Sequence, residues 1–154
     1  FLKNPIISNP QIVKNVLRKK NIKVKSITCD FFMQRPFFKN IKNSNEIFYY
    51  LNLLVKSCHM IGINYIVLPL VDKSSIKNSK EEKFFIKKIK EFEKNIYTKN
   101  IKILFETDYK PLKVIKFLKN FNKNFGINYE SGNSASLNYN IYCITNQVNI
   151  SLWL

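Results

Sequence analysis

The chain of 154 residues has few of the residue types that build disulfide frameworks and common catalytic sites. It contains three cysteines, three glycines and one histidine. The cysteines show no CxxC spacing and are too few and scattered for a disulfide frame, so we expect reduced thiols in a cytoplasmic protein. The glycines form neither GxGxxG nor GxxxxGK[ST], which excludes the usual nucleotide-binding loops. His59 alone, in a helical stretch, cannot build a Ser-His-Asp or Cys-His catalytic set.

Long hydrophobic runs are also absent. No apolar segment approaches the roughly 18–20 residues of a membrane span, so we expect no membrane partner. The first residues, FLKNPIISNP, have no Met, no basic segment and no apolar segment of a signal peptide. We therefore expect that the chain is not a complete natural product at this end.

Acidic residues are scarce, with 10 against 26 basic residues and a net charge of +16. Only Arg18 and Arg35 are arginine, the residue suited to bidentate contacts with phosphate and guanine. The lysines accompany abundant Asn and Ile, which indicates an AT-rich coding bias. We predict solvated lysine surfaces and no specific nucleic-acid partner, with weak, salt-sensitive binding to polyanions from charge alone.

Two periodicities alternate along the chain. Apolar residues recur at helical spacing in residues 10–20, 44–61, 79–98 and 110–122. Between them lie short apolar runs, predicted as strands, in residues 22–28, 64–71, 101–106 and 125–129. Strand spacings of roughly 25–40 residues leave room for a crossover helix each time, so the strands are expected to be parallel. The predicted class is α/β, either a doubly wound sheet or part of a (β/α)8 barrel.

Local patterns add three expectations. Residues 31–38, with four phenylalanines, are predicted as a loop that either packs onto the rim of the fold or walls a pocket. Ser79 and Glu82 have the spacing of a capping box at a helix start. In residues 110–122, Leu112, Ile115 and Leu118 are predicted to face inward.

The strand ends carry the candidate chemistry. Glu106 and Glu130 each close a short apolar run, and Asp30 closes the first. Neighbouring strands lie about 4.8 Å apart, and a divalent cation takes oxygen ligands at about 2.0–2.6 Å, so Glu106 and Glu130 could share a metal. Glu106 could also transfer protons, and the turn at Asn133 could hold a substrate hydroxyl. The alternative interpretation is exposed acids at strand–loop junctions and a turn glycine required by the backbone.

Five segments of the sequence have a recognisable pattern when taken together and in order. They are NPIIS (4–8), SITCDFFM (26–33), GINYIVLP (62–69), Phe105-Glu106 and YESGNSASL (129–137). In this order they resemble a known family, the xylose isomerase-like TIM-barrel sugar phosphate isomerases and epimerases. They resemble segments from before the second helix through the sixth strand. The resemblance therefore implies a partial (β/α)8 barrel over residues 1–140, with residues 141–154 as an irregular tail.

This resemblance implies a divalent metal, Mn or Mg, and proton transfer through an enediolate of a sugar or sugar phosphate. Glu106 would be a metal ligand and a catalytic carboxylate, and Glu130 a ligand where the family usually has Asp. Asn133 and Asp30 would contact substrate. Because strands seven and eight would supply the other ligands, we expect an inactive fragment that self-associates through open barrel edges. The alternatives are a metal-dependent endonuclease-like barrel, which needs several histidines, and a non-catalytic degenerate half-barrel.

Overall fold

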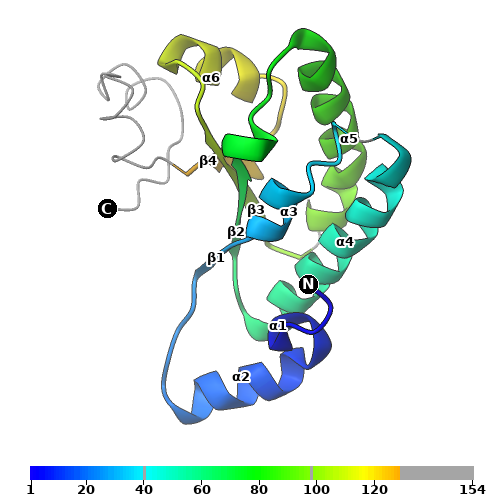
Figure 1. The fold of residues 1–154 in the computed structure, drawn as a ribbon. Helices are drawn as coiled ribbons and strands as arrows, with labels where there is room; N and C mark the ends of the chain where they lie inside the picture. The colour runs from blue at the N-terminus through cyan, green and yellow to red at the C-terminus, as the bar shows by residue number, and fades with distance from the viewer. Residues whose placement is uncertain (40, 98, 129–154) are drawn as a thin grey trace.

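The computed structural model describes residues 1–39, 41–97 and 99–128, in which helices alternate with parallel strands (Figure 1). The strands are β1 (Ser26–Thr28), β2 (Tyr65–Leu70), β3 (Lys102–Thr107) and β4 (Phe125–Ile127). They pair in parallel in chain order, β1-β2-β3-β4. Each connection therefore advances by one strand without the reversal of a doubly wound sheet, as in the wall of a (β/α)8 barrel.

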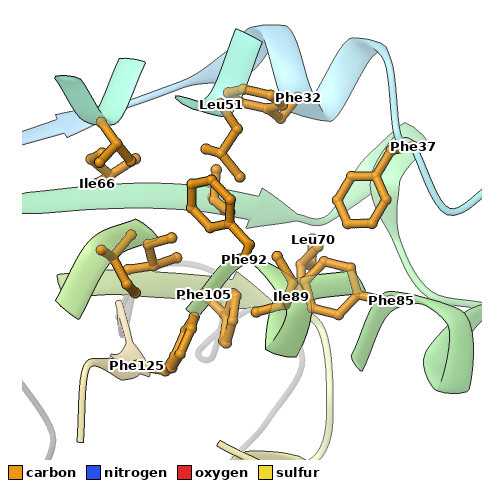
Figure 2. Close-up of a cluster of buried hydrophobic side chains, with 14 of the residues drawn as sticks. Phe32, Phe37, Leu51, Ile66, Leu70, Phe85, Ile89, Phe92, Phe105 and Phe125 are labelled. Carbon is orange, nitrogen blue, oxygen red and sulfur yellow. The ribbon is translucent and has the colours of Figure 1, made fainter. Parts of the chain in front are cut away.

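The helices are α1 (Pro5–Ser8), α2 (Pro10–Lys19), α3 (Asp30–Gln34), α4 (Ser44–Ile61), α5 (Ser79–Tyr97) and α6 (Pro111–Leu118), with short 3-10 turns η1 (Ile41–Asn43) and η2 (Asp72–Ser74). Two helices precede β1, the others connect the strands, and α4 and α5 pack on one face of the sheet (Figure 2). Within the described ranges, no helix is long and apolar enough to cross a membrane.

The long helices follow the sequence pattern closely. Helix α4 matches its predicted bounds and ends at Gly62, whose φ of 95° is the left-handed conformation that favours glycine. Strands β1, β2 and β4 are shorter than predicted, and β1 keeps only three residues of the run 22–28. Strand β3 has the predicted length but begins one residue later. Helix α1 was not predicted; the Asn4 side chain accepts a hydrogen bond from the Ile6 amide at its start.

The core between the sheet and helices α4 and α5 is rich in phenylalanine. Figure 2 shows Leu51 of α4 and Phe85, Ile89 and Phe92 of α5 over the strands that carry Ile66 and Phe105. Phe105 is completely buried, and its ring lies 5.2–5.8 Å from four other aromatic rings, those of Phe85, Phe117, Phe121 and Phe125. Edge-to-face and offset contacts of this kind add to the stabilisation from buried area.

Three local predictions need correction. Residues 30–34 of the predicted aromatic loop form helix α3, while Phe37 and Phe38 pack on Phe85 in the core, which agrees with packing and not with a pocket wall. Leu112 is 71% exposed, because the buried stripe of α6 runs through Val114, Ile115, Phe117 and Leu118.

The start of α5 also differs from the prediction. Asn78, and not Ser79, accepts a hydrogen bond from the Glu81 amide, and the Glu81 carboxylate accepts one from the Lys77 amide. The capping interactions therefore lie one residue earlier than predicted. Glu82 is left free for a different contact, described below.

Candidate functional site

The site is built on the alternation of β3. Ile103 and Phe105 join the core beneath the helices, so Leu104 and Glu106 lie on the opposite face of the sheet. In a (β/α)8 barrel this opposite face is the interior. Glu106, at the carboxyl end of β3, is half-buried and stands in register with Pro69 of β2. The predicted catalytic carboxylate therefore occupies the carboxyl end of the sheet, on its inner face.

A second carboxylate, Asp108, follows β3 at the same end. The hydroxyl of Ser75, in the segment that follows β2, donates a hydrogen bond of 2.5 Å to Asp108 Oδ2. Ser75 is 2% exposed, so this hydrogen bond between the two loops is shielded from solvent on the Ser75 side. The neighbouring Ser74, also buried, donates to the carbonyls of Pro69 and Val71 at 2.6 and 2.9 Å. The Ser74 bonds hold the segment after β2 against the end of β2, and the Ser75 bond joins that segment to the loop after β3.

Tyr109 continues the same loop and connects it to two helices. Its hydroxyl donates to Glu82 of α5 at 2.5 Å, and Lys113 of α6 lies 3.4 Å from the same carboxylate. The Lys113 ammonium is also 3.6 Å from the centre of the Tyr109 ring. Burial of the phenol, followed by its hydrogen bond to Glu82, raises the pKa of Tyr109 above the ordinary value. Tyr109 is therefore a neutral donor that links the loop after β3 to helices α5 and α6, three residues beyond Glu106.

Asp30 lies at the same end but not beside Glu106. It is the exposed first residue of α3, directly after β1, and β2 separates β1 from β3. Two strand spacings amount to about 10 Å, beyond the reach of a shared cation. Asp30 could still lie at the edge of a substrate site at the carboxyl end of the sheet, which is where a residue that contacts substrate would have to be. Beside it, burial raises the pKa of the Cys29 thiol to about 11, which makes that thiol a poor nucleophile at neutral pH.

The predicted residues Glu130 and Asn133 lie outside the described residues, as does the proposed tail, residues 141–154. Across residues 1–39, 41–97 and 99–128, no group of three or more His, Cys, Asp or Glu side chains is placed to hold a metal ion. His59 lies at the opposite end of the fold, in the last turn of α4, where Nδ1 is 3.0 Å from the Lys99 carbonyl oxygen.

Sequence reasoning missed the loop contacts of Ser75, Glu82, Asp108 and Tyr109. Asp108 was visible as a second acid two residues beyond Glu106. The partners were not, because Ser75 is 33 residues from Asp108 and Glu82 is 27 residues from Tyr109. Helical or strand periodicity carries no signal for such pairs.

Comparisons with known proteins bear on the fold. No family model matches the sequence, and no curated protein sequence is significantly similar to it. Among solved structures, a xylose isomerase domain protein from Planctomyces limnophilus matches 97% of this chain and 59% of its own, with a TM-score of 0.74 and 11% identity. The IolI protein with a bound zinc atom matches 92% of this chain and 52% of its own, with a TM-score of 0.69 and 20% identity.

This chain therefore spans a little over half the length of both structures. The likeness confirms the predicted fold, a partial TIM barrel, with the four parallel strands as part of its wall.

Proposed function

We propose that this chain is part of a divalent-metal-dependent isomerase or epimerase that acts on a sugar or sugar phosphate. The observation that carries the proposal is the position of Glu106, at the carboxyl end of β3 and on the face opposite the aromatic core. In barrel enzymes the catalytic side chains come from this end of the strands. The likeness in fold to a xylose isomerase domain protein and to a protein with a bound zinc atom supports the same proposal.

The described residues fit a metal only in part. Glu106 offers a hard oxygen donor, suited to Mn or Mg, on the inner face. Asp108 is already bound to Ser75, and Asp30 lies two strands away. The proposal therefore includes Glu130, three residues beyond β4 in sequence, as a second ligand, with Asn133 and Asp30 as substrate contacts.

The chemistry assigns one role to the metal and one to the protein. A bound divalent cation would stabilise negative charge on a sugar oxygen next to the reacting carbon. Glu106 would act as the general base that accepts a proton from that carbon. The loop contacts of Ser75 and Tyr109 hold the segment after Glu106, so that the carboxylate keeps its direction.

Because two oxygen ligands make an incomplete shell, the 154-residue chain is expected to bind metal weakly and to show isomerase turnover near background. Isothermal titration of the purified chain with Mn²⁺ and Zn²⁺ tests the site. We expect Glu106→Gln to weaken binding at least tenfold, while Glu91→Gln, an exposed acid on α5, leaves it unchanged.

Two results would contradict the proposal. Equal metal binding by the Glu106→Gln chain would remove Glu106 from the site, and no binding by the unmodified chain would favour a non-catalytic half-barrel. Robust turnover of a ketose by the chain alone would contradict the expectation that it is inactive.

A further inference from the structure

Most of the described acidic residues lie toward one end of the fold. Nine of the ten acidic residues are described, and seven of them lie where strands end or where the following helix begins: Asp30, Glu46, Asp72, Glu81, Glu82, Glu106 and Asp108. In contrast, residues 1–29 contain seven basic residues and no acid. These basic residues continue into the loop that leads from α2 to the start of β1, at the end of the sheet opposite Glu106 (Figure 1, lower part).

Helix dipoles account for some of these cations but not for all. Arg18 and Lys19 lie in the last turn of α2, where a positive charge stabilises the helix. Lys23, Lys25 and Lys102 lie on a loop and at a strand start, where no helix end explains them. All three are exposed, and none forms an ion pair with another described residue.

These three lysines line two adjoining hollows that share Lys25. The first, of about 330 Å³, is lined by the end of α2, the following loop and the end of α4, including Arg18 and Lys23. The second, of about 380 Å³, is lined by Lys25, Asn64, Tyr65, Asn100 and Lys102. No acidic side chain lines either hollow.

The second hollow is also held in place by hydrogen bonds. The Asn64 side chain donates to the Asn100 carbonyl at 3.3 Å, and the Asn64 and Tyr65 amides both donate to the Lys25 carbonyl at 3.1 Å. Two asparagine side chains, those of Asn64 and Asn100, therefore line this hollow between lysines on a fixed backbone. Such groups can hydrogen-bond to sugars and base edges, while the lysines contact phosphates.

The sequence predicted only weak binding of polyanions and no specific nucleic-acid partner; beyond that expectation, we propose that this surface, defined by Lys23, Lys25, Lys102 and the two hollows, binds single-stranded nucleic acid without sequence preference. Two adjoining hollows that have Lys25 in common suit a chain of phosphates and bases better than they suit a flat lipid surface. The two hollows also combine lysines with the absence of an acidic lining residue, which gives a polyanion a defined site, whereas net charge alone would attract polyanions everywhere. The surface is at the end of the sheet opposite the proposed metal site and does not depend on it.

The test compares two triple variants with the same change in net charge. Lys23→Gln/Lys25→Gln/Lys102→Gln removes the proposed contacts, and Lys83→Gln/Lys87→Gln/Lys90→Gln removes three exposed lysines of α5. Binding to fluorescent 12-mers of oligo-U and oligo-dT is measured by anisotropy from 0.05 to 0.3 M NaCl, after circular dichroism confirms folding. Three lost phosphate contacts should lower the salt slope by about 2 and weaken binding by about 100-fold at 0.1 M salt.

The expected result is that loss for the first variant, with either oligonucleotide, and less than a threefold loss for the control. Equal losses in the two variants would overturn the proposal, because charge alone would then explain binding. No loss in the first variant would overturn it too. Tighter lysine-dependent binding to phosphatidylserine vesicles, or equal competition by poly-glutamate, would also overturn it, since the occupant would then be a lipid surface or an acidic protein.

Discussion

The contact between Tyr109 and Glu82 offers a direct test of how the loop after β3 is held. Tyr109 is 7% exposed, and its hydroxyl donates to the Glu82 carboxylate at 2.5 Å. The substitution Tyr109→Phe keeps the ring, its packing on Phe117 and its contact with Lys113, and removes only the hydroxyl. Any loss of stability therefore reports on this one hydrogen bond.

Its magnitude follows from charge and burial. A hydrogen bond to a charged group contributes about 1.5–3 kcal/mol. Because Lys113 stays 3.4 Å from Glu82, the carboxylate keeps one partner after the change. We therefore expect Tyr109→Phe to lower the free energy of unfolding by the smaller figure, about 1.5 kcal/mol.

The same contact predicts a dependence on pH. Burial raises the pKa of Tyr109 above the value of about 10 found in an unfolded chain. Above pH 10 the unfolded chain loses a phenol proton that the folded chain retains, so the contribution is complete below pH 10 and falls as pH rises further. The loss reaches up to about 1.4 kcal/mol per pH unit and is absent from Tyr109→Phe. The difference between the two proteins should therefore shrink above pH 10.

The assay is urea unfolding followed by circular dichroism from pH 7 to 11. Tyr50→Phe is a matched control, because Tyr50 donates to Glu46 at a similar distance, 2.6 Å, but at the surface. We expect little change for that control at neutral pH. The reasoning would be refuted if both variants lost the same stability at pH 7, or if Tyr109→Phe declined above pH 10 as steeply as the unmodified chain.

Two further predictions concern the core and the thiols. Phe105→Ala should lower the free energy of unfolding by about 3–5 kcal/mol, because Phe105 is fully buried among four aromatic rings. Phe105→Leu keeps part of the buried volume and should cost clearly less; equal costs in urea unfolding would contradict the view that buried volume at this position sets the loss. Burial raises the pKa of Cys29 to about 11 and that of Cys58 to about 12, so at pH 8 both should react with iodoacetamide at least about 100-fold more slowly in the folded chain than in urea. Peptide mapping by mass spectrometry separates them from Cys143, and fast alkylation of Cys58 in the folded chain would contradict its placement.

Much of the fold could be predicted because periodicity is a local property. The apolar repeat of α4 and the continuous run of β2 are set by which residues must be buried on one face or on two. Spacing then required crossovers, and parallel order followed. The errors are also local in origin. Ile115 and Leu118 are buried as predicted, but the buried face of α6 extends toward Val114 and Phe117, and this leaves Leu112 exposed although it fits the helical spacing.

The candidate site was less accessible from sequence. Glu106 could be proposed from the sequence, because a carboxylate at the end of an apolar run is recognisable without knowledge of the fold. Glu82 was predicted as a capping residue, yet it binds Tyr109, while Asn78 and Glu81 form the cap. Both uses suit an acid in the first turn of a helix. The choice between them depends on where the loop after β3 passes, and only the folded chain determines that.

The direction of Glu106 is in turn a consequence of the aromatic core. Phe105 is completely buried, and strand alternation then sends the next side chain to the opposite face. A slip of β3 by one residue would place the Glu106 carboxylate among phenylalanines and expose the Phe105 ring. Burying an unpaired charge costs several kcal/mol, comparable with the total stability of a small domain. The phenylalanines of α5 and α6 therefore specify the register of β3, and with it the side of the sheet on which the acid stands.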